Sequence, residues 1–72
     1  MPTFVTFRGY GVHYVEIEVD VERVTHFYSI EYNGNHGVEL ALDNGTTVQV
    51  DGYRSDVSKR IHDAIAAKEQ QP

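Results

Sequence analysis

Apolar and acidic residues alternate strictly through one segment in the first third of the chain, and this alternation limits what the chain can fold into. The apolar positions are Val15, Ile17, Val19 and Val21, and the acids between and after them are Glu16, Glu18, Asp20 and Glu22. A repeat of two residues is typical of a β-strand that buries one face and exposes the other. The segment therefore predicts a strand with an apolar face in a core and a stripe of four acids facing solvent.

The end of this strand has a second interpretation. Asp20 could instead cap a short helical turn, because an aspartate side chain accepts hydrogen bonds from the backbone amides at a helix start. Two of the four acids would then leave the stripe. The sequence alone leaves both interpretations open.

Four other segments are extended by the same criteria. They are Thr3–Arg8, Val24–Tyr32, Val38–Leu42 and Thr46–Val50. The last two flank Asn44-Gly45, a pair that is typical of tight hairpin turns, and the glycine-rich stretch 33–37 predicts another turn. We therefore expect about five strands within residues 3–50.

The spacing of apolar residues changes from a strand-like to a helix-like repeat after Tyr53. Val57, Ile61, Ala64 and Ile65 fall at i, i+4, i+7 and i+8, which is one stripe of an amphipathic helix. The pattern predicts a helix over about residues 55–68, with Ser55 as its N-cap and residues 69–72 as a frayed tail.

These elements predict an α+β fold for residues 1–72 as a single domain. We expect a small antiparallel sheet of about five strands in meander order, with the C-terminal helix packed on one face. A chain of 72 residues has room for one hydrophobic core. The other face of the sheet would be solvated or covered by a partner.

The charge of the chain favours some partners over others. Six Lys and Arg against eleven Asp and Glu give a net charge of -5, which disfavours nucleic acid and anionic membranes and favours basic proteins. With no cysteine, the chain can form neither a disulfide nor a thiol-based site. Because the first residues lack the pattern of a signal peptide and no apolar stretch approaches the length of a membrane span, we expect a cytoplasmic protein.

No group of residues predicts catalysis, a metal or a cofactor. The spacing of the four histidines, His13, His26, His36 and His62, matches no zinc pattern. His13 and His26 could approach each other if their strands pair, but no third ligand is evident. The serines form no Gly-x-Ser-x-Gly motif, and the glycines lie in turns. We expect a protein that is not an enzyme.

The acidic stripe suggests a binding function. Residues on one face of a strand are spaced by ~6.7 Å, twice the rise per residue, which is comparable to the spacing of successive phosphates in a nucleic-acid strand. One interpretation is therefore phosphate mimicry, in which the acids occupy a basic groove of a nucleic-acid-binding protein. The other is an ordinary solvated face of a half-buried strand.

The aromatic residues are numerous for so short a chain, with five Tyr and three Phe. Tyr14 shares its predicted face with the acids, and Phe27 lies on the polar side of its strand, so both are predicted to point away from the helix. Aromatic rings in such a setting are favoured at protein interfaces. Alternatively, the rings cover the edges of a thin core or pair across strands.

The stretch from Val19 to Ile65 resembles the small flagellar and swarming-motility protein family FlbD. The resemblance covers the C-terminal two thirds and rests mainly on Leu42-Asp43-Asn44-Gly45 and on the helix beginning near Ser55-Asp56-Val57. This chain differs in its residues 51–55, in its glycine-rich turn and in its N-terminal strand. The resemblance implies no catalytic residues.

We therefore predict a non-catalytic acidic interaction protein that inhibits a nucleic-acid-binding host protein, of the kind that phages and mobile elements encode. The predicted binding residues are Glu16, Glu18, Asp20, Glu22, Tyr14 and Phe27. One alternative is a homodimeric structural or regulatory protein of the FlbD type, formed by pairing edge strands or by burying Phe27 and Tyr14. Another is an enzyme or metal protein that uses His13 and His26.

Overall fold

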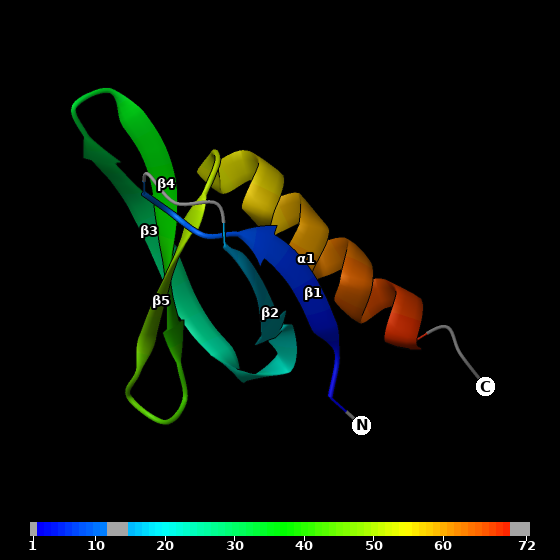
Figure 1. The fold of residues 1–72 in the computed structure, drawn as a ribbon. Helices are drawn as coiled ribbons and strands as arrows, with labels where there is room; N and C mark the ends of the chain where they lie inside the picture. The colour runs from blue at the N-terminus through cyan, green and yellow to red at the C-terminus, as the bar shows by residue number, and fades with distance from the viewer. Residues whose placement is uncertain (1, 12–14, 70–72) are drawn as a thin grey trace.

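A computed structural model describes residues 2–11 and 15–69, which form five strands, one short 3-10 helix and one α-helix (Figure 1). In chain order these elements are β1 (Phe4–Arg8), β2 (Glu16–Asp20), η1 (Val21–Arg23), β3 (Val24–Tyr32), β4 (Asn35–Leu42), β5 (Thr47–Asp51) and α1 (Arg54–Glu69). The predicted α+β class, the order of the strands and the C-terminal helix are confirmed.

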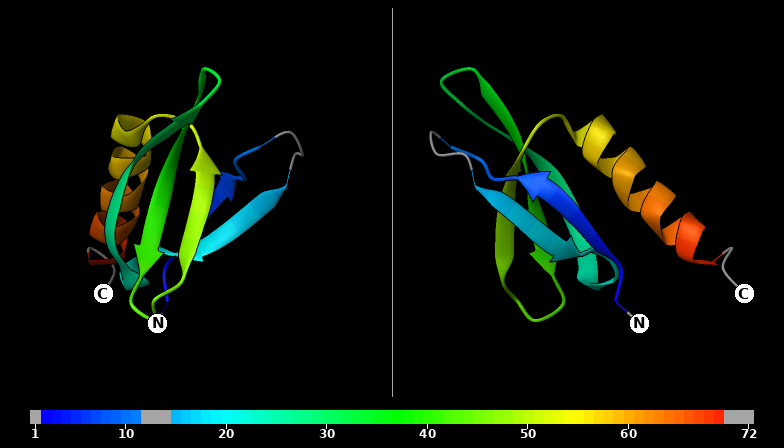
Figure 2. Two further views of the ribbon diagram at one scale, coloured as in Figure 1. Left: turned by 90° about the vertical axis from the view of Figure 1, so that its left-hand side faces the viewer. Right: turned by 45° about the vertical axis from the view of Figure 1, so that its right-hand side comes forward.

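The strands are divided between two sheets. β1 pairs with β2, and β3, β4 and β5 form a second sheet in that order, with antiparallel neighbours throughout. Among the described residues, a β-bridge between Gly9 and Val50 and a hydrogen bond from the amide of Tyr10 to the carbonyl of Gln49 (3.3 Å) connect the two sheets. The sequence pattern predicts one continuous sheet, but the chain turns away from β2 at η1 before β3 begins, so β2 and β3 do not pair. Figure 2 shows the β1–β2 hairpin diverging from the other three strands.

The core lies between the two sheets and the helix. Its fully buried members come from every layer: Phe7, Val19, Val21, Val38, Leu40, Val50, Val57 and Ile61. The predicted apolar stripe of the helix faces this core, with Ala64 and Ile65 partly buried against it. The helix begins at Arg54, so Ser55 is its second residue rather than the predicted N-cap. Glu69 belongs to the helix, and the rest of the predicted tail lies outside the described residues.

The inward face of β3 differs from the prediction. The pairing with β4 is irregular between Val24 and His26, and Phe27 then lies opposite the buried Leu40. Phe27 is partly buried against the core, so the prediction that it points away from the helix is wrong. Strict alternation from Val24 would put Val24 and Phe27 on opposite sides of the strand, whereas the irregularity places them on the same side. As a result Tyr28, opposite Glu39, faces outward.

Tyr10 ties the segment after β1 to the far end of the β3–β4 hairpin. Its hydroxyl donates a hydrogen bond to the carbonyl of Asn35 (2.8 Å) and accepts one from the amide of Tyr32 (3.1 Å). Its ring lies against Gly37, where a side chain would collide with it. The glycine of β4 is therefore required by a contact with a residue 27 positions away in sequence (37 − 10).

Replacing Gly37 by alanine tests this contact. The added Cβ would collide with two carbons of the Tyr10 ring and lie 2.9 Å from the carbonyl oxygen of Val50. We expect a loss of about 1–3 kcal/mol in the free energy of unfolding, as for other insertions into a packed site. Urea denaturation followed by far-UV circular dichroism measures it. In a Tyr10→Ala background the same change should cost less by about 1 kcal/mol, and an equal cost in both backgrounds would show that the ring is not the obstacle.

Candidate protein-binding surface

The outer face of the β1–β2 hairpin carries the two acids that remain available to a partner. Glu16 and Glu18 are exposed on β2, opposite Arg8 and Thr6 of β1, while the intervening Ile17 packs against the core. Among the described residues, the side chains of Glu16 and Glu18 take part in none of the hydrogen bonds or ion pairs. Their carboxylates are thus directed into solvent, as the alternation predicts.

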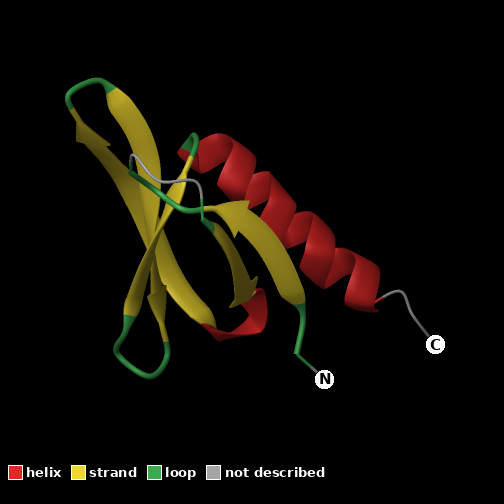
Figure 3. Cartoon of the chain, viewed as in Figure 1, coloured by secondary structure: helices red, strands yellow, loops and turns green. Residues whose placement is uncertain are grey.

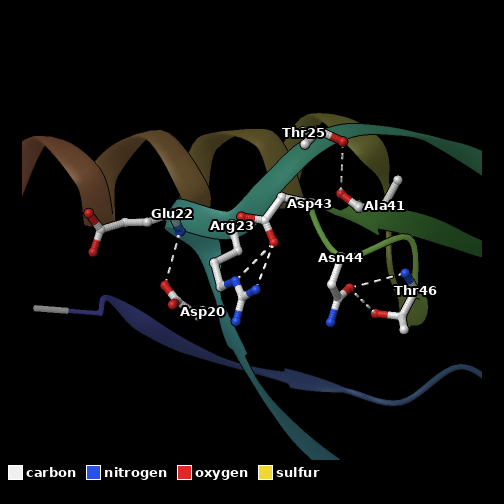
Figure 4. A network of polar contacts seen from close by, with 8 residues as sticks. All are labelled: Asp20, Glu22, Arg23, Thr25, Ala41, Asp43, Asn44 and Thr46. Carbon is white, nitrogen blue, oxygen red and sulfur yellow. Dashed lines mark hydrogen bonds and ion pairs between the residues drawn. The ribbon is translucent and has the colours of Figure 1, made fainter.

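Asp20 has a structural role at the end of β2. One of its carboxylate oxygens accepts hydrogen bonds from the amide of Glu22 (3.2 Å) and from the amide of Thr3 (3.3 Å). It is the N-cap of η1, so the second interpretation of this strand end is the one that the structure adopts. Figure 4 shows this cap beside the ion pair of Arg23 with Asp43 (2.9 Å), which fixes the turn to the β4–β5 hairpin.

Glu22 is not part of an exposed acidic stripe, because its side chain binds the helix. Its carboxylate accepts hydrogen bonds from the ammonium of Lys68 (2.6 Å) and the hydroxyl of Thr3 (2.9 Å). The hydrogen bond from Lys68, followed by that from Thr3, holds the pKa of Glu22 below its ordinary value. The row of four acids expected from the sequence is therefore reduced to Glu16 and Glu18, with Asp20 and Glu22 bound within the fold.

The lowered pKa of Glu22 predicts a dependence of stability on pH. A carboxyl group whose pKa falls on folding contributes stability above its unfolded-state pKa, and this contribution is lost as the pH falls through the folded-state value. Glu22→Gln should therefore lower the melting temperature at pH 7, and the difference from wild type should shrink toward pH 3 as Glu22 of the wild type becomes protonated. Glu18→Gln, which removes an acid without a partner, is the control and should change the melting temperature little at either pH.

Of the two predicted aromatic residues, only Phe27 lies in the described part of the chain, and it does not face outward as expected. Phe27 packs inward, and Tyr14 lies outside the described residues, as does His13. Among the described residues the exposed tyrosines are Tyr28 and Tyr32 on the outer face of β3, and Tyr53 just before the helix. Phe27 and Tyr28 are adjacent in the sequence, and phenylalanine is more apolar than tyrosine. This difference is a sequence signal that Phe27, rather than Tyr28, faces the core.

His26, His36 and His62 each lie close to a polar side chain, which for His62 is that of Ser58 at 3.4 Å. His26 lies 3.0 Å from the hydroxyl of Thr25, His36 lies 3.2 Å from the carboxylate of Glu31, and the ring of Tyr53 stacks on that of His36 at 5.0 Å. Across residues 2–11 and 15–69, no group of three or more histidines and acids is placed to hold a metal ion.

A partly open pocket lies at the same hairpin. It is lined by Thr6, Phe7, Arg8, Val15 and Glu16. Phe4, which is 59% exposed, and the exposed Val15 add apolar surface near the two acids. The hairpin thus offers carboxylates and apolar groups together, the mixture that protein interfaces commonly use.

Comparison with protein-family models, with curated proteins and with solved structures finds no match to this chain. The resemblance to the FlbD family consequently stays a prediction. None of the helices in the described part of the chain is long and apolar enough to cross a membrane.

Proposed function

We propose that this chain is a non-catalytic binding module for a protein partner with a basic surface, and that it contacts this partner through the acidic hairpin face. That face consists of Glu16 and Glu18 of β2 with Phe4, Thr6 and Arg8 of β1. The observation that carries the proposal is the pair of exposed carboxylates on one strand face, neither of which has a side-chain partner among the described residues. The net charge of -5 adds attraction for a basic partner at longer range.

The spacing of the two acids favours a nucleic-acid-binding protein as the partner, because the pair can mimic two phosphates. Glu16 and Glu18 are two residues apart on a strand, so their attachment points are separated by ~6.7 Å, comparable to successive phosphates. A basic groove that binds a nucleic-acid backbone would accept such a pair in place of two phosphates. The module would then inhibit a nucleic-acid-binding protein in the cytoplasm, as small acidic proteins of phages and mobile elements do. Size and charge support this origin.

The charges on the hairpin indicate which of the two acids contributes more to partner binding. Glu16 lies opposite the guanidinium-bearing Arg8, which offsets part of its negative potential, whereas Glu18 lies opposite the neutral Thr6. Opposite charges that face each other across two strands attract by a fraction of a kcal/mol, about 0.2–1. Glu18 should therefore contribute more to partner binding than Glu16.

Charge reversal tests the proposal. The Glu16→Lys/Glu18→Lys variant should fail to capture a basic protein that the immobilised wild-type chain retains from a lysate. The matched control is Asp51→Lys/Glu69→Lys, which changes the net charge by the same amount at exposed sites on other elements. Mass spectrometry identifies the retained protein and its amount.

The control should capture as much partner as wild type does. Equal capture by all three proteins would show that the hairpin face is not the binding surface, and equal loss in both variants would show that only net charge matters. A captured protein without affinity for nucleic acid would refute the mimicry and leave the binding surface in place.

A further inference from the structure

The outer edge of β3 is unprotected. Within the described residues β3 pairs with β4 alone, so it is an edge strand, and it is nine residues long. Natural edge strands are commonly guarded by lysine, proline, short length or a bulge. β3 contains no lysine, arginine or proline, Glu31 is its only formal charge, and its irregularity lies near its start. The remaining segment, Phe27–Tyr32, is regular and pairs residue by residue with β4.

The far half of this edge projects beyond the helix. The end of the β3–β4 hairpin extends away from α1 in all three ribbon views (Figures 1 and 2), and Figure 3 shows the same projection by element type. On the outer face of this half lie Tyr28 and Tyr32, which are 47% and 67% exposed, with Ile30 between them. The projecting strand thus presents three uncharged side chains in a row.

The backbone of the projecting strand is oriented for pairing. The amide of Tyr32 points toward β4, because it donates to the Tyr10 hydroxyl that itself donates to Asn35 of β4. Alternate residues of an antiparallel strand direct their backbone groups to opposite edges. Ser29 and Glu31 therefore direct their amides and carbonyls toward the free edge.

We propose that a second copy of this chain pairs with β3 in antiparallel orientation, about a two-fold axis at Ile30. In this register Tyr28 lies opposite Tyr32 of the second copy, Ile30 opposite its own counterpart, and Ser29 opposite Glu31. The pairing joins the two three-stranded sheets into one and uses the same surface from both copies, as a two-fold interface requires. Aromatic residues that face each other across strands stabilise such a pair.

Charge favours a second copy over a basic partner at this edge. With a net charge of -5, two copies repel each other over most of their surface. The segment from Tyr28 to Tyr32 is the exception, because it carries one acid, Glu31, which is already 3.2 Å from His36. In the proposed register that acid meets Ser29, and no two like charges lie opposite each other. A basic partner would gain more at the hairpin face with Glu16 and Glu18.

Sedimentation equilibrium tests the dimer. We expect wild-type protein to form dimers, and Ile30→Lys, which places two ammonium groups together at the axis, to weaken the dimer at least about tenfold. Thr47→Lys is the control: it adds the same charge to the outer face of the same sheet, on β5, and should dimerise as wild type does. A wild-type monomer up to about 1 mM, or an Ile30→Lys dimer as tight as wild type, would overturn the proposal.

A single cysteine tests the register without adding charge. The chain has no cysteine, so Ile30→Cys provides the only thiol. Residues opposite each other at a position without mutual backbone hydrogen bonds have Cα atoms about 4.5 Å apart, within the range that a disulfide spans. Mild oxidation should convert Ile30→Cys to a covalent dimer much faster than Thr47→Cys. Equal rates for the two variants would contradict the proposed axis.

Discussion

The Phe7→Ala variant is expected to lose about 3–5 kcal/mol of its free energy of unfolding. Phe7 is 2% exposed and lies in the core between β1 and the helix. The guanidinium of Arg60 lies 4.6 Å from the centre of its ring and donates a hydrogen bond to the carbonyl of Thr6 (2.6 Å), so the ring also fixes the helix against β1. A domain of this size has a total stability of roughly 4–11 kcal/mol, so the expected loss is a large fraction of the total.

Urea denaturation followed by far-UV circular dichroism measures this loss. Phe4→Ala is the matched control, because it makes the same chemical change on the same strand at a side chain that is 59% exposed. It should cost less than about 1 kcal/mol, since little of its ring leaves water on folding. Similar costs at the two positions would contradict the assignment of Phe7 to the core.

Leu40→Ala should cost about 2–5 kcal/mol. Leu40 is 0% exposed at the centre of β4, between Phe27 of β3 and Val48 of β5. Truncation leaves a cavity at the point where the three-stranded sheet meets the rest of the core, and close-packed neighbours fill such a cavity only in part. The melting temperature from a thermal scan and the urea midpoint should both fall.

Leu42→Ala is the control for this change. It removes the same atoms from the same strand, but Leu42 is only partly buried, at the end of β4 opposite Val24. Its cost should be less than half that of Leu40→Ala. A larger cost at Leu42 would place the centre of the core nearer the β4–β5 turn than the structure has it.

Much of the fold could be predicted because its signals are local. The alternation from Val15 to Asp20, the Asn44-Gly45 turn and the stripe of Val57 and Ile61 each lie within a few residues, and each gave the correct element. Strand and helix periods depend on the geometry of a short stretch of backbone. The exposed positions of Glu16 and Glu18 follow from the same period.

The rest depends on contacts between distant residues. The Glu22 carboxylate accepts a hydrogen bond from Lys68, 46 residues later, and the ring of Tyr10 fills the space that a side chain at position 37 would need. No pattern within a strand encodes these contacts. The reversal of β3, with Phe27 inward and Tyr28 outward, arises from one irregularity in its pairing with β4, and an insertion of that kind exchanges the two faces of everything that follows it.

The candidate binding surface is smaller than the sequence predicts. Asp20 and Glu22 have structural partners, and Phe27 packs against the core. What remains of the predicted acidic stripe is Glu16 and Glu18, which are adjacent on one face of β2. The binding proposal therefore depends on two carboxylates and the apolar groups beside them.

The most direct test of that proposal is whether this chain competes with nucleic acid for the partner protein. Fluorescence anisotropy of a labelled duplex bound to the captured basic protein reports how much nucleic acid stays bound as this chain is added. We predict that wild-type protein displaces the duplex completely, that Asp51→Lys/Glu69→Lys does so at a similar concentration, and that Glu16→Lys/Glu18→Lys does not. A duplex that stays bound at saturating wild-type protein, or equal displacement by the hairpin variant, would contradict the account.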